Sequence, residues 1–279
     1  MEEKLVSVIV RTHSRPAVLR ETLESIRRQT YKNIEVVVSE DGKDTAGNMI
    51  KTEFSDMNIH YMASGVHIGR CAAANRALEA SKGEYICFLD DDDLFFENHV
   101  ETLVNALNST DMLAAYTIAY ESAIKVESYE PYVYKEVKRH VEFKQPYCRL
   151  LLYYNNLFPI QCVMFHRSLY EKAGGMDESL EVLEDWDMWV RYSQYTDYFF
   201  VNKITSLYRV PAGKKEKERH SILEGAYEAQ IKMYGKYKMT LTPEQINHDM
   251  KYILTDYTES RIKKFLKKIR DYIRRKGQS

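Results

Sequence analysis

Tyr85-Ile86-Cys87-Phe88-Leu89 runs directly into Asp90-Asp91-Asp92-Asp93, and this stretch decides the fold. Five apolar or aromatic residues in a row predict a short strand buried on both faces, as in a parallel sheet. In open α/β sheets, ligands bind beyond the carboxyl ends of such strands. Four neighbouring carboxylates repel each other, and a hard divalent cation such as Mg²⁺ or Mn²⁺ relieves that repulsion. The alternative is a solvated acidic loop that caps a helix after Leu94.

Strand and helix signals alternate through the first hundred residues. Apolar, β-branched runs predict strands, and helical spacing of apolar residues together with an alanine-rich segment predicts helices between them. This order predicts an α/β fold with a mainly parallel sheet and helices on both faces. The predicted strands are 6–10, 34–38 and 59–62, and the predicted helices are 16–29, 45–55 and 71–80.

The second half of the chain is less regular. Apolar runs predict strands at 113–119 and 161–165, and helical patterns predict helices at 168–173 and 184–192. The segment 122–146 is polar, rich in tyrosine and without a clear period, so we interpret it as an insertion or a mobile segment. Residues 221–279 have the pattern of a helical C-terminal extension.

Composition excludes several classes of function. The chain has 279 residues and a net charge of −1, which gives no reason to expect a nucleic-acid partner. The four cysteines form no CxxC pair, so a zinc knuckle or a disulfide framework is disfavoured and a reducing, cytoplasmic setting is expected. No stretch approaches the roughly 20 apolar residues of a membrane span, and the first apolar run is too short for a signal peptide.

Asp41 follows the second predicted strand and should lie at the same edge of the sheet as the four aspartates. A carboxylate only accepts hydrogen bonds. Asp41 is therefore suited to receive the N3–H of uracil or thymine or the N1–H of guanine, but cytosine offers no such donor. The alternative is an ordinary turn aspartate before Gly42.

Glu184 and Asp185 begin the predicted helix that continues through Trp186. Acidic residues interact favourably with the dipole at a helix N-terminus, which is one explanation for the pair. The other is general-base catalysis, because transfer to a hydroxyl requires a group that removes its proton.

Two basic segments lie in the last third of the chain. His220 follows the basic stretch 211–219, where it would either complete a metal shell or be an ordinary loop histidine. Residues 261–276 form an amphipathic, strongly basic helix pattern, which suits peripheral contact with an anionic membrane or docking on the protein's own core.

Together and in this order, these signals resemble the family 2 glycosyltransferases of GT-A fold, over about residues 4–210. The motifs that carry the resemblance are 6–16, 19–38 with Asp41-Gly42, 69–75, 83–93, and 174–178 followed by Glu184-Asp185-Trp186. The resemblance implies a GT-A type, Rossmann-like domain over 1–220. Within it, residues 1–110 would bind the nucleotide sugar and 111–220 the acceptor, before the extension 221–279.

Carried over residue by residue, the resemblance implies that Asp41 reads the donor base, that Asp92 binds the metal and that Asp185 is the catalytic base. The remaining implied nucleotide contacts are Thr12, His13, Arg15, Arg70, Asp90 and Asp91, and the implied acceptor contacts are Glu184 and Trp186. Two positions depart from the family. Ala74 stands where arginine is common, with Arg70 as the candidate to replace it, and Arg11 stands where proline is frequent.

The resemblance implies an inverting enzyme that uses Mn²⁺ or Mg²⁺ and a nucleotide-sugar donor, with a UDP-sugar preferred to thymidine or guanosine donors. The implied acceptor is a glycan or a lipid-linked molecule in surface polysaccharide assembly, at the inner membrane surface. Two other classes stay open: a non-catalytic nucleotide- or carbohydrate-binding module, and a metal-dependent phosphotransferase. Asp90-Asp91-Asp92-Asp93 superficially resembles the haloacid-dehalogenase nucleophile motif, but Leu94 replaces its hydroxyl residue. A dehydrogenase is disfavoured because no GxGxxG follows the first strand.

Overall fold

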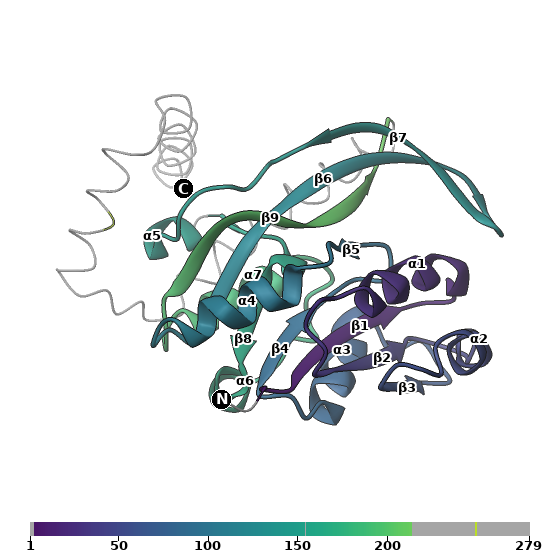
Figure 1. Ribbon diagram of the computed structural model, residues 1–279, viewed down its shortest axis with the longest axis horizontal. Coiled ribbons are helices and arrows are strands. Elements are labelled where there is room, and N and C mark those ends of the chain that lie inside the picture. The colour runs from purple at the N-terminus through teal and green to yellow at the C-terminus, as the bar shows by residue number, and fades with distance from the viewer. Residues whose placement is uncertain (1–2, 154, 214–248, 250–279) are drawn as a thin grey trace, which may run out of the picture.

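The computed structural model describes residues 3–153, 155–213 and Asp249. A single sheet forms the centre, and helices cover both of its faces (Figure 1). The strands are β1 Val6–Thr12, β2 Ile34–Glu40, β3 Ile59–Ala63, β4 Tyr85–Phe88, β5 Leu94–Phe95, β6 Ala114–Tyr129, β7 Tyr132–His140, β8 Val163–His166 and β9 Tyr198–Pro211. The helices are α1 Pro16–Arg27, α2 Gly47–Glu53, α3 Arg70–Ala80, α4 His99–Asn108, α5 Arg149–Leu152, α6 Arg167–Ala173 and α7 Glu184–Tyr192, with a 3₁₀ turn at Ile160–Cys162.

The sheet has the order β3-β2-β1-β4-β8-β6-β9-β5, and β7 pairs with β6. The first four strands in this order are parallel, because the helices α1, α2 and α3 connect them along the chain and cross back over the sheet. Further along, β8 runs antiparallel to both β4 and β6, β9 runs parallel to β6, and β5 runs antiparallel to β9. The predicted α/β class of GT-A type is confirmed.

Alternating side chains of the buried strands supply two separate apolar layers. Ile9 and Val37 belong to the layer that contains α3 and α7, whereas Val8 and Val36 belong to the layer that contains α1 and α4. All four side chains are fully or almost fully buried. This double-sided burial explains why the strand sequences are continuous apolar runs rather than alternating ones.

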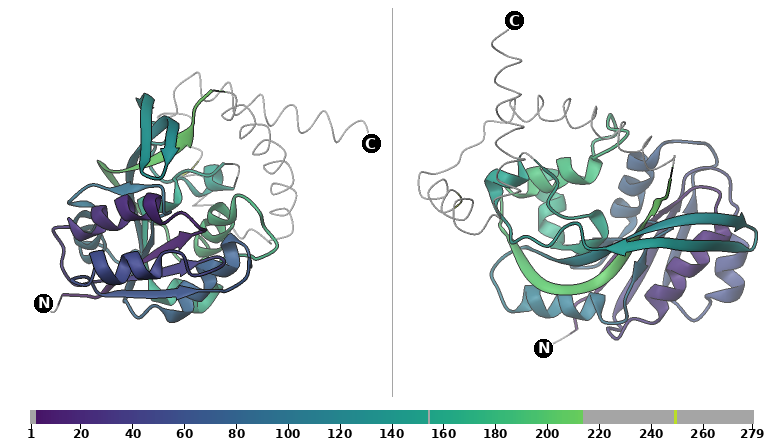
Figure 2. Two further views of the ribbon diagram at one scale, coloured as in Figure 1. Left: turned by 90° about the vertical axis from the view of Figure 1, so that its right-hand side faces the viewer. Right: turned by 90° about the horizontal axis from the view of Figure 1, so that it is seen from above.

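The interpretation of 122–146 as an insertion or a mobile segment is wrong. Most of that segment belongs to the outer half of β6 and to β7, which form a long hairpin that projects past the body of the sheet (Figures 1 and 2). Two register shifts, after Ala123 and after Val126, interrupt the pairing. These bulges, together with solvent on much of the hairpin's surface, remove the period-two pattern by which a strand is recognised.

The predicted extension 221–279 lies outside the described residues except for Asp249. The carboxylate of Asp249 accepts a hydrogen bond of 3.0 Å from the amide of Leu150 at the start of α5. Within the described part of the chain, none of the helices combines the length and the apolar character that crossing a membrane requires.

Candidate active site

The carboxyl ends of β1, β2 and β4 face the start of α7 and the end of β9 across a cavity of about 920 Å³. This edge of the sheet is where a ligand was expected. Ten of the residues named from the sequence line the cavity: Thr12, His13, Arg15, Asp41, Arg70, Asp90, Asp91, Asp92, Glu184 and Asp185. Of the other two, His220 lies outside the described residues and Trp186 lies in the core.

The four aspartates, which form one cluster in the sequence, have four different environments. Asp90 accepts two hydrogen bonds from Arg11, at 2.8 and 2.9 Å. Asp91 is buried and accepts from the hydroxyl of Thr12 and from Arg15. Its burial raises the pKa above the usual range, against the opposing charge of Arg15.

Asp92 is the member of the cluster that suits a metal. Its side chain is 35% exposed, and Arg15 contacts one of its oxygens at 3.2 Å. A partly exposed carboxylate oxygen that lines this cavity is a ligand that Mg²⁺ or Mn²⁺ prefers. Asp92 therefore fits the implied ion as one of its ligands.

Asp93 has a structural role. Its carboxylate is buried and accepts a 3.0 Å hydrogen bond from the amide of Arg209. Burial raises its pKa well above the ordinary value. The alternative of a helix cap after Leu94 is wrong, because Leu94 begins β5 and α4 starts only at His99.

Two side chains hold the backbone of the acidic loop 90–93. The hydroxyl of Thr22, on α1, contacts the carbonyls of Asp91 and Asp93 at 2.8 and 2.9 Å. Arg209, on β9, donates to the carbonyl of Asp92 at 2.9 Å and to Glu21 on α1 at 2.6 Å. Sequence reasoning did not find Arg209, because its partners Asp92 and Glu21 are more than 100 residues away along the chain.

Arg11 explains a position for which the sequence offered no reason. Its side chain is buried and bridges Asp90 to Glu184, whose Oε1 lies 2.7 Å from Nη1. A charge at the end of a buried strand is costly unless it is paired, and two carboxylates pair this one. In the sequence, the signal for this role was a charged residue, Arg11, directly after the apolar run 6–10.

Asp185 is held in place by two hydrogen bonds. Oδ2 accepts from the side-chain amide of Asn156 at 2.9 Å, and Oδ1 accepts from the amide of Trp186 at 2.8 Å. Burial, and next the charge of Glu184, raise the pKa of Asp185 to about 7, while Asn156 and Arg11 oppose this shift. A carboxylate tuned in this way can take a proton near neutral pH. Asn156 was not predicted.

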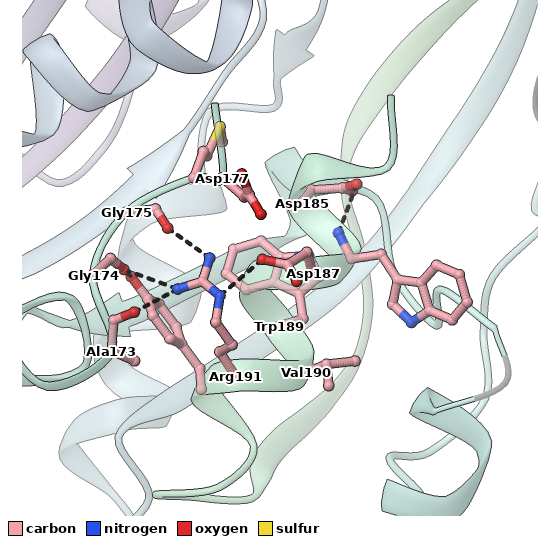
Figure 3. A network of polar contacts seen from close by, with 12 residues as sticks. Ala173, Gly174, Gly175, Asp177, Asp185, Asp187, Trp189, Val190 and Arg191 are labelled. Carbon is pink, nitrogen blue, oxygen red and sulfur yellow. Dashed lines mark hydrogen bonds and ion pairs between the residues drawn. The ribbon is translucent and has the colours of Figure 1, made fainter. Parts of the chain in front are cut away.

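Arg191, in the last turn of α7, links this helix to the segment that follows α6. Figure 3 shows the guanidinium of Arg191 bonded to Asp187 and to the carbonyls of residues 173–175. Leu183 precedes the helix with φ of 62°, a left-handed conformation that is unusual for leucine. These contacts join α7, which carries Asp185 in its first turn, to the loop after α6.

Trp186 is fully buried, and its indole N–H donates to the carbonyl of Leu152 at 2.6 Å. The prediction that its side chain contacts an acceptor is therefore wrong. In a helix, adjacent residues point in different directions, so Trp186 packs into the core while Asp185 faces the cavity.

Asp41 is preorganised by the loop before α3. Its two oxygens accept from the amides of Ile68 and Gly69, at 2.6 and 3.1 Å, and His67 lies 2.8 Å from Oδ2. These partners belong to a distant loop, which distinguishes Asp41 from a turn aspartate bonded to its own neighbours. The position of the carboxylate is thereby fixed at the edge of the cavity.

Ala74, which stands where arginine is common, is buried on α3, and its neighbours Arg70 and Asn75 make polar contacts from this helix. Arg70, at the start of α3, is 56% exposed and reaches to 3.7 Å from Glu184. Asn75 instead joins α3 to Met176 through two hydrogen bonds of 2.8 and 2.9 Å. A Cβ on Gly175 would lie 2.2 Å from the Asn75 side chain, so glycine is required there.

Comparison with known proteins identifies the family of this chain and agrees with its fold. The profile of Glycosyl transferase family 2 matches residues 7–174, more than half of the chain. The chain therefore belongs to glycosyltransferase family 2. An uncharacterized glycosyltransferase of Rickettsia typhi is 28% identical over 214 residues, which is 74% of this chain and 64% of that protein. The putative colanic acid biosynthesis glycosyl transferase WcaA of Escherichia coli is 25% identical over 215 residues, covering 76% of this chain and 75% of WcaA.

Two solved structures share the fold. The mannosyltransferase PcManGT from Pyrobaculum calidifontis, in complex with GDP-Man and Mn²⁺, superposes with a TM-score of 0.63 at 17% identity, covering 92% of this chain and 71% of that one. Staphylococcus aureus TarS 1–349 in complex with UDP-GlcNAc gives a TM-score of 0.59 at 19% identity, over 76% of this chain and 60% of that one.

Proposed function

We propose that the chain moves a sugar from a nucleoside diphosphate donor to an acceptor hydroxyl in a single inverting displacement. The observation that carries this proposal is that Asp92 and Asp185 line the same cavity. Asp92 is partly exposed and suited to a metal, and Asp185 is a carboxylate with a raised pKa. In this proposal residues 1–110 hold the donor and residues 111–220 hold the acceptor.

The proposed step is a displacement at the anomeric carbon. Asp185 takes the proton of the acceptor hydroxyl as its oxygen bonds to that carbon, and the bond from the carbon to the diphosphate oxygen breaks on the opposite face. The electron pair of that bond leaves with the nucleoside diphosphate. Arg15, which lies beside Asp91 and Asp92, is placed to meet the departing charge. A divalent ion on Asp92, when bound, supplies Lewis-acid stabilisation of the same charge.

We propose a UDP-sugar as the donor, with thymidine and guanosine donors as second choices. Asp41 offers only acceptor atoms, which match the N3–H of uracil and thymine and the N1–H of guanine. The structure of TarS in complex with UDP-GlcNAc supports a uridine donor. The structure of PcManGT in complex with GDP-Man is the reason to retain a guanosine donor as a second choice. Thr12, His13, Arg70, Asp90 and Asp91 are the other proposed donor contacts.

The proposed acceptor is a glycan or a lipid-linked sugar. The acceptor side of the cavity is lined by the hairpin residues Glu121, Lys138 and His140, next to Glu184. The name of WcaA, a putative colanic acid biosynthesis glycosyl transferase, supports a role in polysaccharide assembly, and we propose that this takes place at the cytoplasmic face of the membrane. The segment 261–276, proposed to contact that membrane, and the tentative metal ligand His220 lie outside the described residues.

Calorimetric binding of UDP, dTDP, GDP and CDP tests the proposal, each with Mn²⁺ and with a chelator, on wild type and Asp92→Ala. We expect UDP to bind in the presence of Mn²⁺ and to lose that binding in Asp92→Ala. Failure of all four nucleotides to bind would overturn the proposal. Binding without sugar release from any UDP-sugar, across a panel of acceptors, would favour the non-catalytic alternative.

A further inference from the structure

A second group of possible metal ligands lies beside Asp41, separate from the acidic loop. One ring nitrogen each of His13 and His67 and one carboxylate oxygen of Asp41 all lie within 4.8 Å of one another. The two imidazole rings meet edge to face, with centroids 5.3 Å apart. Within the described part of the chain, these three side chains are the histidine, cysteine or acidic residues that come together closely enough, as a group of at least three, to hold a metal ion.

The fold brings these three residues together from distant parts of the sequence. His13 follows β1, Asp41 follows β2, and His67 lies in the loop before α3, so all three meet at the carboxyl edge of the sheet. Nδ1 of His13 contacts the backbone carbonyl of Asp41. The amides of Ile68 and Gly69 fix the carboxylate from behind, as outer partners do for a metal-binding carboxylate.

The chemistry of this group differs from that of the acidic loop. Two imidazoles and one carboxylate form a donor set that Zn²⁺ and other late transition ions prefer, whereas Mg²⁺ and Mn²⁺ prefer oxygen. Ligand atoms around a tetrahedral Zn²⁺ lie about 3.3 Å apart, given metal–ligand distances near 2 Å. Nδ1 of His67 lies 2.8 Å from Oδ2 of Asp41, slightly closer than this spacing, and His67 is 73% exposed, so it can turn to admit an ion while Asp41 is already fixed.

We propose that His13, Asp41 and His67 bind a late transition-metal ion such as Zn²⁺, and that this ion competes with the nucleotide for Asp41. The competition rests on the proposed function, in which the Asp41 carboxylate receives the N–H of the donor base. An ion bound to that carboxylate occupies its free lone pairs and neutralises its charge. The site would therefore inhibit the enzyme, in contrast to the activating ion expected at Asp92.

Zn²⁺ alone, titrated by calorimetry into the full-length chain, tests the site. The Asp92→Asn background removes the carboxylate best placed to bind Zn²⁺ in the acidic loop. We expect His67→Ala and the double variant His13→Ala/His67→Ala to weaken Zn²⁺ binding by about tenfold or more. His60→Ala, an exposed histidine on β3, is the matched control and should bind Zn²⁺ as its parent does. Unchanged Zn²⁺ binding in the folded double variant, or no binding in its parent, would overturn the site.

The competition is tested separately in the otherwise wild-type chain with Mn²⁺ saturating. We expect added Zn²⁺ to raise the apparent Kd of UDP by about tenfold, and to raise it much less in His67→Ala. A Zn²⁺ site that leaves the affinity for UDP unchanged would refute the competition and leave the metal site standing. If UDP fails to bind even without Zn²⁺, the proposed function fails, and the titration with Zn²⁺ alone still decides whether the site exists.

Discussion

Nη1 of Arg11 lies 2.7 Å from Oε1 of Glu184, the residue directly before Asp185. The same guanidinium holds Asp90 at the start of the acidic loop. One buried cation on β1 therefore joins two sides of the cavity, the acidic loop and the start of α7. Arg11 also lowers the pKa of Asp185, whereas Glu184 raises it.

Arg11→Met should destabilise the protein by about 3–5 kcal/mol, because it leaves buried carboxylate charge without its partner. The free energy of unfolding, measured by urea titration, checks this value. Lys4→Met is the control, since Lys4 and Glu84 form a half-exposed ion pair at the surface that is worth about 1 kcal/mol or less. Equal losses in the two variants would show that the Arg11 bridge has no special role.

Asp185→Asn should lower kcat by about 10²–10⁴-fold, because asparagine cannot accept the proton of the acceptor. The affinity for UDP should stay near that of the wild type, since in the proposed mechanism Asp185 contacts the acceptor hydroxyl and not the nucleotide. Initial rates with saturating donor, together with UDP calorimetry on the same preparation, separate the two effects. Near-normal turnover would remove Asp185 from the role of base.

Glu184→Gln should shift the acidic limb of the kcat–pH profile to lower pH. The base works when it is deprotonated, so activity rises as the pH passes upward through the pKa of Asp185. Removing the negative charge of Glu184 lowers that pKa and moves the rise to lower pH. Asn156→Ala should move the limb in the opposite direction, because it removes a hydrogen bond that lowers the pKa. Shifts in the same direction would contradict this assignment.

Arg209→Met should weaken Mn²⁺-dependent UDP binding, because the acidic loop loses the donor that holds the carbonyl of Asp92. Arg20→Met is the control on α1, where Arg20 and Glu53 form an exposed pair far less enclosed than Arg209. We expect the control to bind UDP with unchanged affinity. The Kd of UDP at several Mn²⁺ concentrations checks the difference, and identical values for the two variants would contradict it.

The sequence was sufficient to predict the parallel half of the sheet and its carboxyl edge. Continuous apolar runs such as 6–10 and 85–89 are found where a strand is buried on both faces, and the chemistry-bearing residues follow those strands directly. Local pattern was therefore enough to bring Asp41, Asp90 and Asp92 to one cavity.

The residues that arrange the site were harder to predict. Arg11 meets Glu184 across 173 positions, and Arg209 meets Asp92 across 117, so no local window contains both partners. The β6–β7 hairpin was missed because bulges shift its alternation. Trp186 was misassigned because its neighbour in sequence, Asp185, points the other way.

The bond from the Arg209 amide to Asp93, together with the pairing of β5 with β9, has a consequence for biosynthesis. The ribosome makes β1 to β4 long before it makes β9. In a nascent chain that ends before Arg209, Thr22 and Arg15 are present, but the acidic loop still lacks the donors that bind the Asp92 carbonyl and the Asp93 carboxylate. The geometry of the acidic loop should therefore be completed late in translation, after β9 has emerged. The parallel strands and β9 are in this respect a single unit of assembly.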